Sequence, residues 1–143
     1  MNAYLRTALA ALVLCATAAA AQAQVAVKDA WIRASVPKQS ATGAFMQITA
    51  AEDSKLVSAS SPAAPVVEVH EMAMEGGVMR MREVPAIALP AGKTVALQPN
   101  GYHIMLMNLP KQLKAGESVP LTLVVEGKDG KREKVEVSAL VPS

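Results

Sequence analysis

The chain has 143 residues, of which 52% are hydrophobic and only 3% aromatic, and its formal net charge is +2. Its 14 basic and 12 acidic residues nearly balance, so its charge predicts neither a nucleic-acid-binding surface nor a polybasic membrane patch. The chain has eight methionines, two histidines and one cysteine.

The first 23 residues have the composition of a secretory signal peptide. Arg6 supplies a positive charge, residues 8–20 are an apolar run that ends in small residues, and Ala21-Gln22-Ala23 is an A-x-A cleavage site. The strongly apolar part is shorter than the roughly 18–20 residues that a membrane span needs. We therefore expect an exported protein that is cleaved after Ala23 and has no stable membrane insertion.

Cleavage at this point would leave residues 24–143 as a single domain, because that length suits one hydrophobic core. It would also remove Cys15, the only cysteine, so the core alone would have to stabilise the fold. A lipid anchor at Cys15 is the alternative. Leu14 disfavours this anchor, because lipoproteins carry a small residue at that position.

Most of the remaining chain has the alternation and the turn residues of short β-strands. No window of a dozen residues combines a 3.6-residue apolar period with helix start and stop signals. Short strands separated by proline and glycine are typical of an antiparallel sandwich or barrel, in whose core we expect Trp31 to pack. The expected strands are AFMQIT (44–49), VVEVHEMAM (66–74), GYHIMLMN (101–108), LTLVVE (121–126) and KVEVSALV (134–141).

The stretch HEMAMEGGVMRMR (70–82) predicts a β-hairpin. Its Gly76-Gly77 pair suits a two-residue loop, because glycine accepts the positive φ of tight hairpin turns. The predicted cross-strand pairs are Glu75 with Val78, Met74 with Met79, Met72 with Met81, and Glu71 with Arg82.

Because successive strand residues face opposite ways, this register separates two chemistries. Glu71 and Arg82 take one face as an expected exposed ion pair. The other face, which we call the sulfur face of the hairpin, carries Met72, Met74, Met79 and Met81, with His70 on the same side.

The second histidine lies in a similar strand. His103, Met105 and Met107 alternate with Ile104 and Leu106. Since Ile104 and Leu106 suit the core, we expect His103 and Met105 to point outward or toward a rim.

These residues indicate a soft-metal site rather than ordinary packing. Both histidines lie in methionine-lined strands, and six of the seven methionines after residue 23 fall between positions 72 and 107. Thioether ligands select Cu(I), whereas zinc prefers thiolate, imidazole or carboxylate and Mg²⁺ and Ca²⁺ prefer oxygen. A site without cysteine also suits an oxidising compartment, because thioethers cannot form disulfides.

The spacing of four of these residues resembles that of the periplasmic copper chaperones called PCuAC. Ten residues separate His70 from Met81, twenty-one separate Met81 from His103, and one separates His103 from Met105. The surrounding text also resembles the family over nearly all of the mature chain. The similar stretches are AWIRASVP, ATGAFMQITA, VVEVHEMAMEGGVMRMREV, LPAGKTVALQPNGYHIMLMNL and LKAGESVPLTLVVEG.

The resemblance implies a cupredoxin-like Greek-key β-barrel with one Cu(I) held by His70, Met81, His103 and Met105. It further implies a periplasmic protein that supplies copper to the CuA centre of cytochrome oxidase, alone or with a cysteine-bearing chaperone. The other methionines would line the rim of the site or pack.

Three other functions remain open, and an enzyme is not expected. The chain could scavenge or store copper for resistance, or it could be a β-sandwich interaction module whose methionine face binds a protein. Electron transfer is the third, although a blue-copper site would need a cysteine ligand. No nucleophile motif and no glycine-rich phosphate loop is present.

Overall fold

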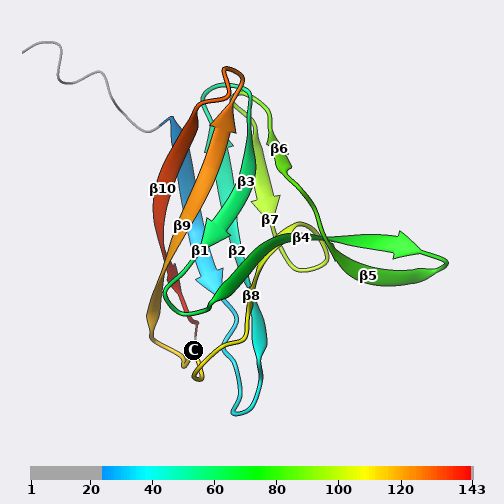
Figure 1. Ribbon diagram of the computed structural model, residues 1–143, viewed down its shortest axis with the longest axis vertical. Coiled ribbons are helices and arrows are strands. Elements are labelled where there is room, and N and C mark those ends of the chain that lie inside the picture. The colour runs from blue at the N-terminus through cyan, green and yellow to red at the C-terminus, as the bar shows by residue number, and fades with distance from the viewer. Residues whose placement is uncertain (1–23, 143) are drawn as a thin grey trace, which may run out of the picture.

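The computed structural model describes residues 24–142, so the predicted signal peptide, residues 1–23, lies outside the described residues. The described residues form ten strands and no helix, and therefore no helix that could cross a membrane (Figure 1). The strands are β1 (Val25–Ile32), β2 (Ala41–Ala50), β3 (Ser54–Ser60), β4 (Val66–Glu75), β5 (Val78–Glu83), β6 (Ile87–Leu89), β7 (Thr94–Leu97), β8 (His103–Met107), β9 (Ser118–Gly127) and β10 (Arg132–Leu140).

One curled sheet contains all of these strands. Its order is β5-β4-β8-β2-β1-β10-β9-β3-β6, and β7 also pairs with β2. Every ladder is antiparallel except the short β1–β10 contact, at Trp31 and Leu140. Because β3 also lies beside β4, the sheet wraps around one core (Figure 1). The expected all-β sandwich or barrel is confirmed.

The core follows the period-two alternation that predicted the strands. In β9, Leu121 and Leu123 are fully buried, whereas Thr122 between them is only partly buried. Burying such a side chain stabilises the fold by about 1.5–3 kcal/mol relative to leaving it exposed. In β8 the same alternation buries Ile104 and Leu106, whereas β2 is buried on both faces from Thr42 to Met46 and contributes Ala44, Met46 and Ile48 to this core.

Four strands were not predicted from the sequence, and each lacks a clear pattern. β6 and β7 have only three and four residues. In β3, only Leu56 is buried. The alternation of β1 is broken by a register shift between Lys28 and Trp31, where Asp29 has a φ of 54°.

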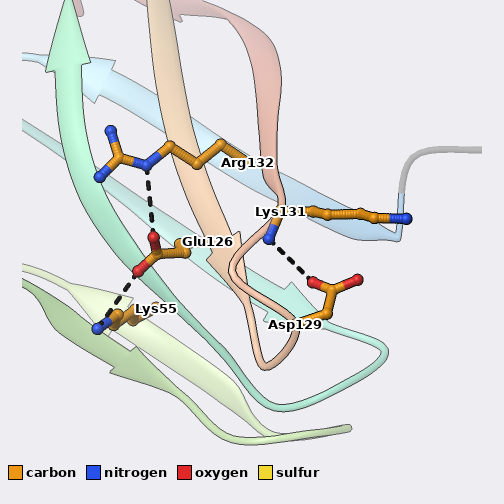
Figure 2. A network of polar contacts seen from close by, with 5 residues as sticks. All are labelled: Lys55, Glu126, Asp129, Lys131 and Arg132. Carbon is orange, nitrogen blue, oxygen red and sulfur yellow. Dashed lines mark hydrogen bonds and ion pairs between the residues drawn. The ribbon is translucent and has the colours of Figure 1, made fainter.

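The β9–β10 turn carries the polar network of Figure 2. The Glu126 carboxylate lies 3.3 Å from Nζ of Lys55 and 3.5 Å from Nε of Arg132. The backbone N–H of Lys131 donates to Oδ1 of Asp129 at 3.0 Å. Exposed ion pairs contribute only about 0–1 kcal/mol each. This network therefore adds little to the stability of the fold.

Candidate metal centre

The predicted hairpin is present in the predicted register. β4 and β5 project from the body of the sheet (Figure 1), and their loop is Gly76-Gly77. Both glycines have positive φ, 57° and 82°, as a type I′ turn requires. Met72 pairs with Met81 and Met74 with Met79, so the sulfur face is confirmed.

The opposite face of the hairpin is charged, as expected. Nε of Arg82 lies 2.8 Å from Oε1 of Glu71, and its Nη1 lies 3.4 Å from Oε1 of Glu75. The hairpin therefore has thioether side chains on one face and ion pairs on the other.

Pairing of β4 with β8 brings the two histidines together. His70 lies directly opposite His103, and their ring centroids are 5.8 Å apart. The hairpin then carries Met81 back over this pair, and its Sδ lies 3.2 Å from Nε2 of His103. Met105 shares a strand face with His103 and lies opposite Glu68 in the same ladder. Three of the four predicted ligands, His70, Met81 and His103, therefore lie close together, and Met105 is on the same strand face as His103.

The protonation of His103 follows from its neighbours. Its Nδ1 lies 3.0 Å from the carbonyl oxygen of Gly101, so this nitrogen carries the proton and donates. Nε2 therefore presents its lone pair to the thioether of Met81. Burial, as the largest cause, lowers the pKa of His103, which favours this neutral ring.

The lone pairs of Nε2 and Sδ face each other without a hydrogen between them. Two acceptors gain nothing from this approach unless a cation comes between them. The donor set therefore suits a metal ion that accepts both imidazole and thioether.

His70 shows the complementary feature. Its Nε2 lies 2.9 Å from Oε1 of Glu68, and because a carboxylate accepts, Nε2 carries a proton and donates it. Its Nδ1 is buried and has no hydrogen-bond partner among the described residues. Buried polar atoms rarely lack a partner. This nitrogen is therefore a candidate to bind a ligand. A metal on Nδ1 would complete a carboxylate–histidine–metal arrangement.

The sequence analysis did not identify Glu68. The alternation of side chains along a strand could have identified it, because Glu68 and His70 are two residues apart and share a face of β4. A carboxylate oriented toward a ligand histidine is a recurrent feature of metal sites. The predicted set of uncharged donors therefore lies beside one negative charge.

The environment of His103 differs from the expectation. Ile104 and Leu106 point into the core as predicted, and His103 lies on the opposite face, yet only 4% of His103 is exposed. Phe45 covers it at 6.3 Å between ring centroids. Trp31 is not a core residue as expected; it is half-buried on this outer face, 4.6 Å from Phe45 between centroids.

A small residue makes room for this aromatic cover. A Cβ on Gly43 would lie 3.0 Å from the Phe45 ring, so a larger residue there would push the ring away. The outer face thus forms a second packed layer over His103.

The described residues offer no other centre for zinc, magnesium or calcium. Between residues 24 and 142, no group of three or more histidine, cysteine, aspartate or glutamate side chains could hold a metal ion. A zinc, magnesium or calcium site normally needs such a group. The thioether and imidazole donors favour a soft ion.

Comparison with known sequences gives one family and one relative. Residues 25–141 match the family described as "Putative lipoprotein LpqE-like". The chain is 35% identical over 100 residues to "Putative lipoprotein Lxx21020" of Leifsonia xyli subsp. xyli (strain CTCB07). This match covers 69% of the chain and 60% of the relative, so the chain spans about three fifths of that protein.

Several solved structures have the same fold. The structure of CuI-DR1885 from Deinococcus radiodurans is 34% identical with a TM-score of 0.64, and the match covers 88% of this chain and 83% of that one. Apo-DR1885 is 36% identical with a TM-score of 0.61, covering 86% and 82%. The copper-bound PCuAC domain from PmoF2 has a TM-score of 0.67 at 24% identity, covering 86% and 96%. The expected cupredoxin-like fold is confirmed.

Proposed function

The chain belongs to the LpqE-like family and is a PCuAC-type protein, and from this premise we propose that it is a periplasmic copper chaperone that carries one Cu(I) ion. The proposed ligands are His70, Met81, His103 and Met105.

One observation carries this proposal. Nε2 of His103 and Sδ of Met81 face each other at 3.2 Å, while the buried Nδ1 of His70 on the opposite strand lacks a partner. The atoms come from β4, β5 and β8, so the fold itself assembles them. Gly101 and Glu68 hold the proton on the other nitrogen of each ring, which leaves one free lone pair per histidine.

The ligand types support Cu(I) as the cargo. Thioether and imidazole donors are uncharged and soft, and Cu(I) is the physiological ion that prefers them. The CuI-DR1885 structure, which is 34% identical to this chain, supports the same assignment by similarity.

The exposure of the site supports delivery rather than storage. Met81 is 52% exposed and His103 only 4% exposed. An incoming thiolate can therefore displace the methionine first, without unfolding of the sheet. Thiolates are charged and soft, so the ion should move to the paired cysteines of a CuA subunit or of a cysteine-bearing chaperone.

The binding test is an anaerobic Cu(I) titration against a chromophoric chelator, with ligand identification by X-ray absorption. Met81→Leu and His103→Ala should each bind Cu(I) at least tenfold more weakly than the wild type. Met107→Leu is the matched control, because Met107 lies at the far end of β8 from His103. Wild-type affinity in Met81→Leu would refute the assignment.

The delivery test mixes the Cu(I)-loaded protein with an equal concentration of a reduced, soluble CuA-type dithiol domain. After separation, copper should be on the dithiol domain. Retention on this protein would instead favour copper scavenging.

The proposed location rests on the amino terminus and on the relatives. The family and the Leifsonia relative are both described as lipoproteins, which supports export. We propose residues 1–23 as a cleaved signal peptide and residues 24–143 as the copper-binding domain, and a lipid anchor at Cys15 is the alternative.

A further inference from the structure

The sulfur face of the hairpin holds more thioethers than the proposed centre uses. Met74 is 65% exposed and Met79 is 42% exposed, so neither packs in the core. Met72 lies between them and the histidines and is partly buried. These three methionines have no role in the four-ligand site.

We propose that Met72, Met74 and Met79 form a second site, which binds a soft monovalent metal ion through thioether sulfur alone. Its ligand is Cu(I), or Ag(I) as a chemical substitute. Binding at this site does not depend on the proposed centre, whereas its use as an entry point for the cargo rests on the proposed function.

The register brings the three sulfur atoms within reach of one ion. The residues that flank a two-residue loop form a hydrogen-bonded pair, so Met74 and Met79 form the next, non-hydrogen-bonded pair. Their side chains start about 4.5–5.5 Å apart. Met72 follows about 7 Å along the same face of β4. Methionine has three rotatable side-chain bonds, so these sulfurs can converge.

The exposure of the sulfur face favours an ion over packing. A solvent-exposed strand position does not require a flexible thioether for packing, and Met74 and Met79 are both exposed on this face. The other face of the same hairpin is charged, as a solvated strand should be. Uncharged sulfur donors attract soft ions and reject the hard cations that are abundant in solution.

The position of the second site explains how an ion could reach the buried histidines. Met72 is directly opposite Met81, and Met81 contacts His103. The Met74–Met79 pair lies further out along the ladder, next to the Glu75–Val78 pair that flanks the loop. The thioethers therefore form a continuous row from solvent to the imidazole pair, and an ion can pass along it by exchanging one sulfur at a time.

The first experiment is an anaerobic Cu(I) titration of the full protein against chelators of graded affinity. The wild type should bind two equivalents, the second at least tenfold more weakly. The double variant Met74→Leu/Met79→Leu should bind only the first, because leucine conserves volume but removes sulfur. Met107→Leu should keep both. A single equivalent in the wild type, or two in the double variant, would overturn the proposal.

A measurement on the unaltered protein guards against misfolding of the variant. With ¹³C-methyl methionine, Ag(I) beyond one equivalent should shift the methyl signals of Met72, Met74 and Met79 but not that of Met46, which is buried in the core. Unchanged hairpin methyl signals would contradict the second site.

A third variant separates this proposal from the proposed function. His103→Ala should lose the tight equivalent and keep the weak one. If His103→Ala kept both equivalents, the four-ligand centre would be wrong while the hairpin site stood. Loss of both equivalents in His103→Ala would overturn the independent hairpin site.

Discussion

The carboxylate of Glu68 should set the Cu(I) affinity through His70. Glu68→Ala would remove the acceptor that holds the proton on Nε2 of His70, at 2.9 Å. The ring could then rotate or change tautomer, and its Nδ1 would no longer be fixed as a lone-pair donor. The expected result is weaker Cu(I) binding without loss of the fold.

The magnitude follows from the kind of contact and its burial. Loss of a residue that orients a metal-bound histidine typically weakens metal binding 10–100-fold. The side chain of Glu68 is 31% exposed and that of His70 is 13% exposed, so solvent weakens the interaction. We therefore expect the lower part of that range, about 10–30-fold, or about 1.4–2 kcal/mol.

The assay is anaerobic competition with a Cu(I) chelator at pH 7, with circular dichroism to verify the fold. Glu68→Gln is the matched variant, because its amide oxygen can still accept from Nε2 without the charge. It should recover part of the affinity. An affinity of Glu68→Ala within twofold of the wild type would refute the orienting role.

Three further predictions concern pH, the hairpin turn and the amino terminus. Burial of the ring lowers the pKa of His103 below its ordinary value of 6.5, so the unfolded chain takes up the proton more readily. The free energy of unfolding of the apo protein should therefore be highest above pH 6.5 and should fall as the pH falls through the lowered pKa. A free energy of unfolding, measured with denaturant, that did not change between pH 7.5 and 5 would contradict this. Because Gly76 and Gly77 both have positive φ, the double variant Gly76→Ala/Gly77→Ala should destabilise the turn by roughly 1–2 kcal/mol per residue. Amide exchange in β5 should become faster, and exchange in the core should not change. The control Gly76→Asn should be tolerated. After export, intact mass spectrometry should find a chain of residues 24–143, and a lipidated amino terminus would contradict the predicted cleavage.

Local patterns in the sequence were sufficient to determine the long strands and the hairpin. Strand alternation and the Gly76-Gly77 pair depend only on neighbouring residues, so the sulfur face and its register were predictable. The same alternation separated Ile104 and Leu106 from His103. The short strands β6 and β7 and the irregular β1 were not predictable, because their residues lack a period and are held by partners elsewhere in the sheet.

Only the tertiary structure decided how the histidines meet and what surrounds them. His70 and His103 are distant in sequence, and their register depends on how β4 pairs with β8, which in turn pairs with β2. The burial of His103 depends on Phe45, which comes from that third strand. The tautomer of each ring is set by one oxygen, from Glu68 or Gly101, whose position the fold determines. A sequence specifies which donors are present, but the direction of a lone pair depends on contacts between elements that are far apart in the chain.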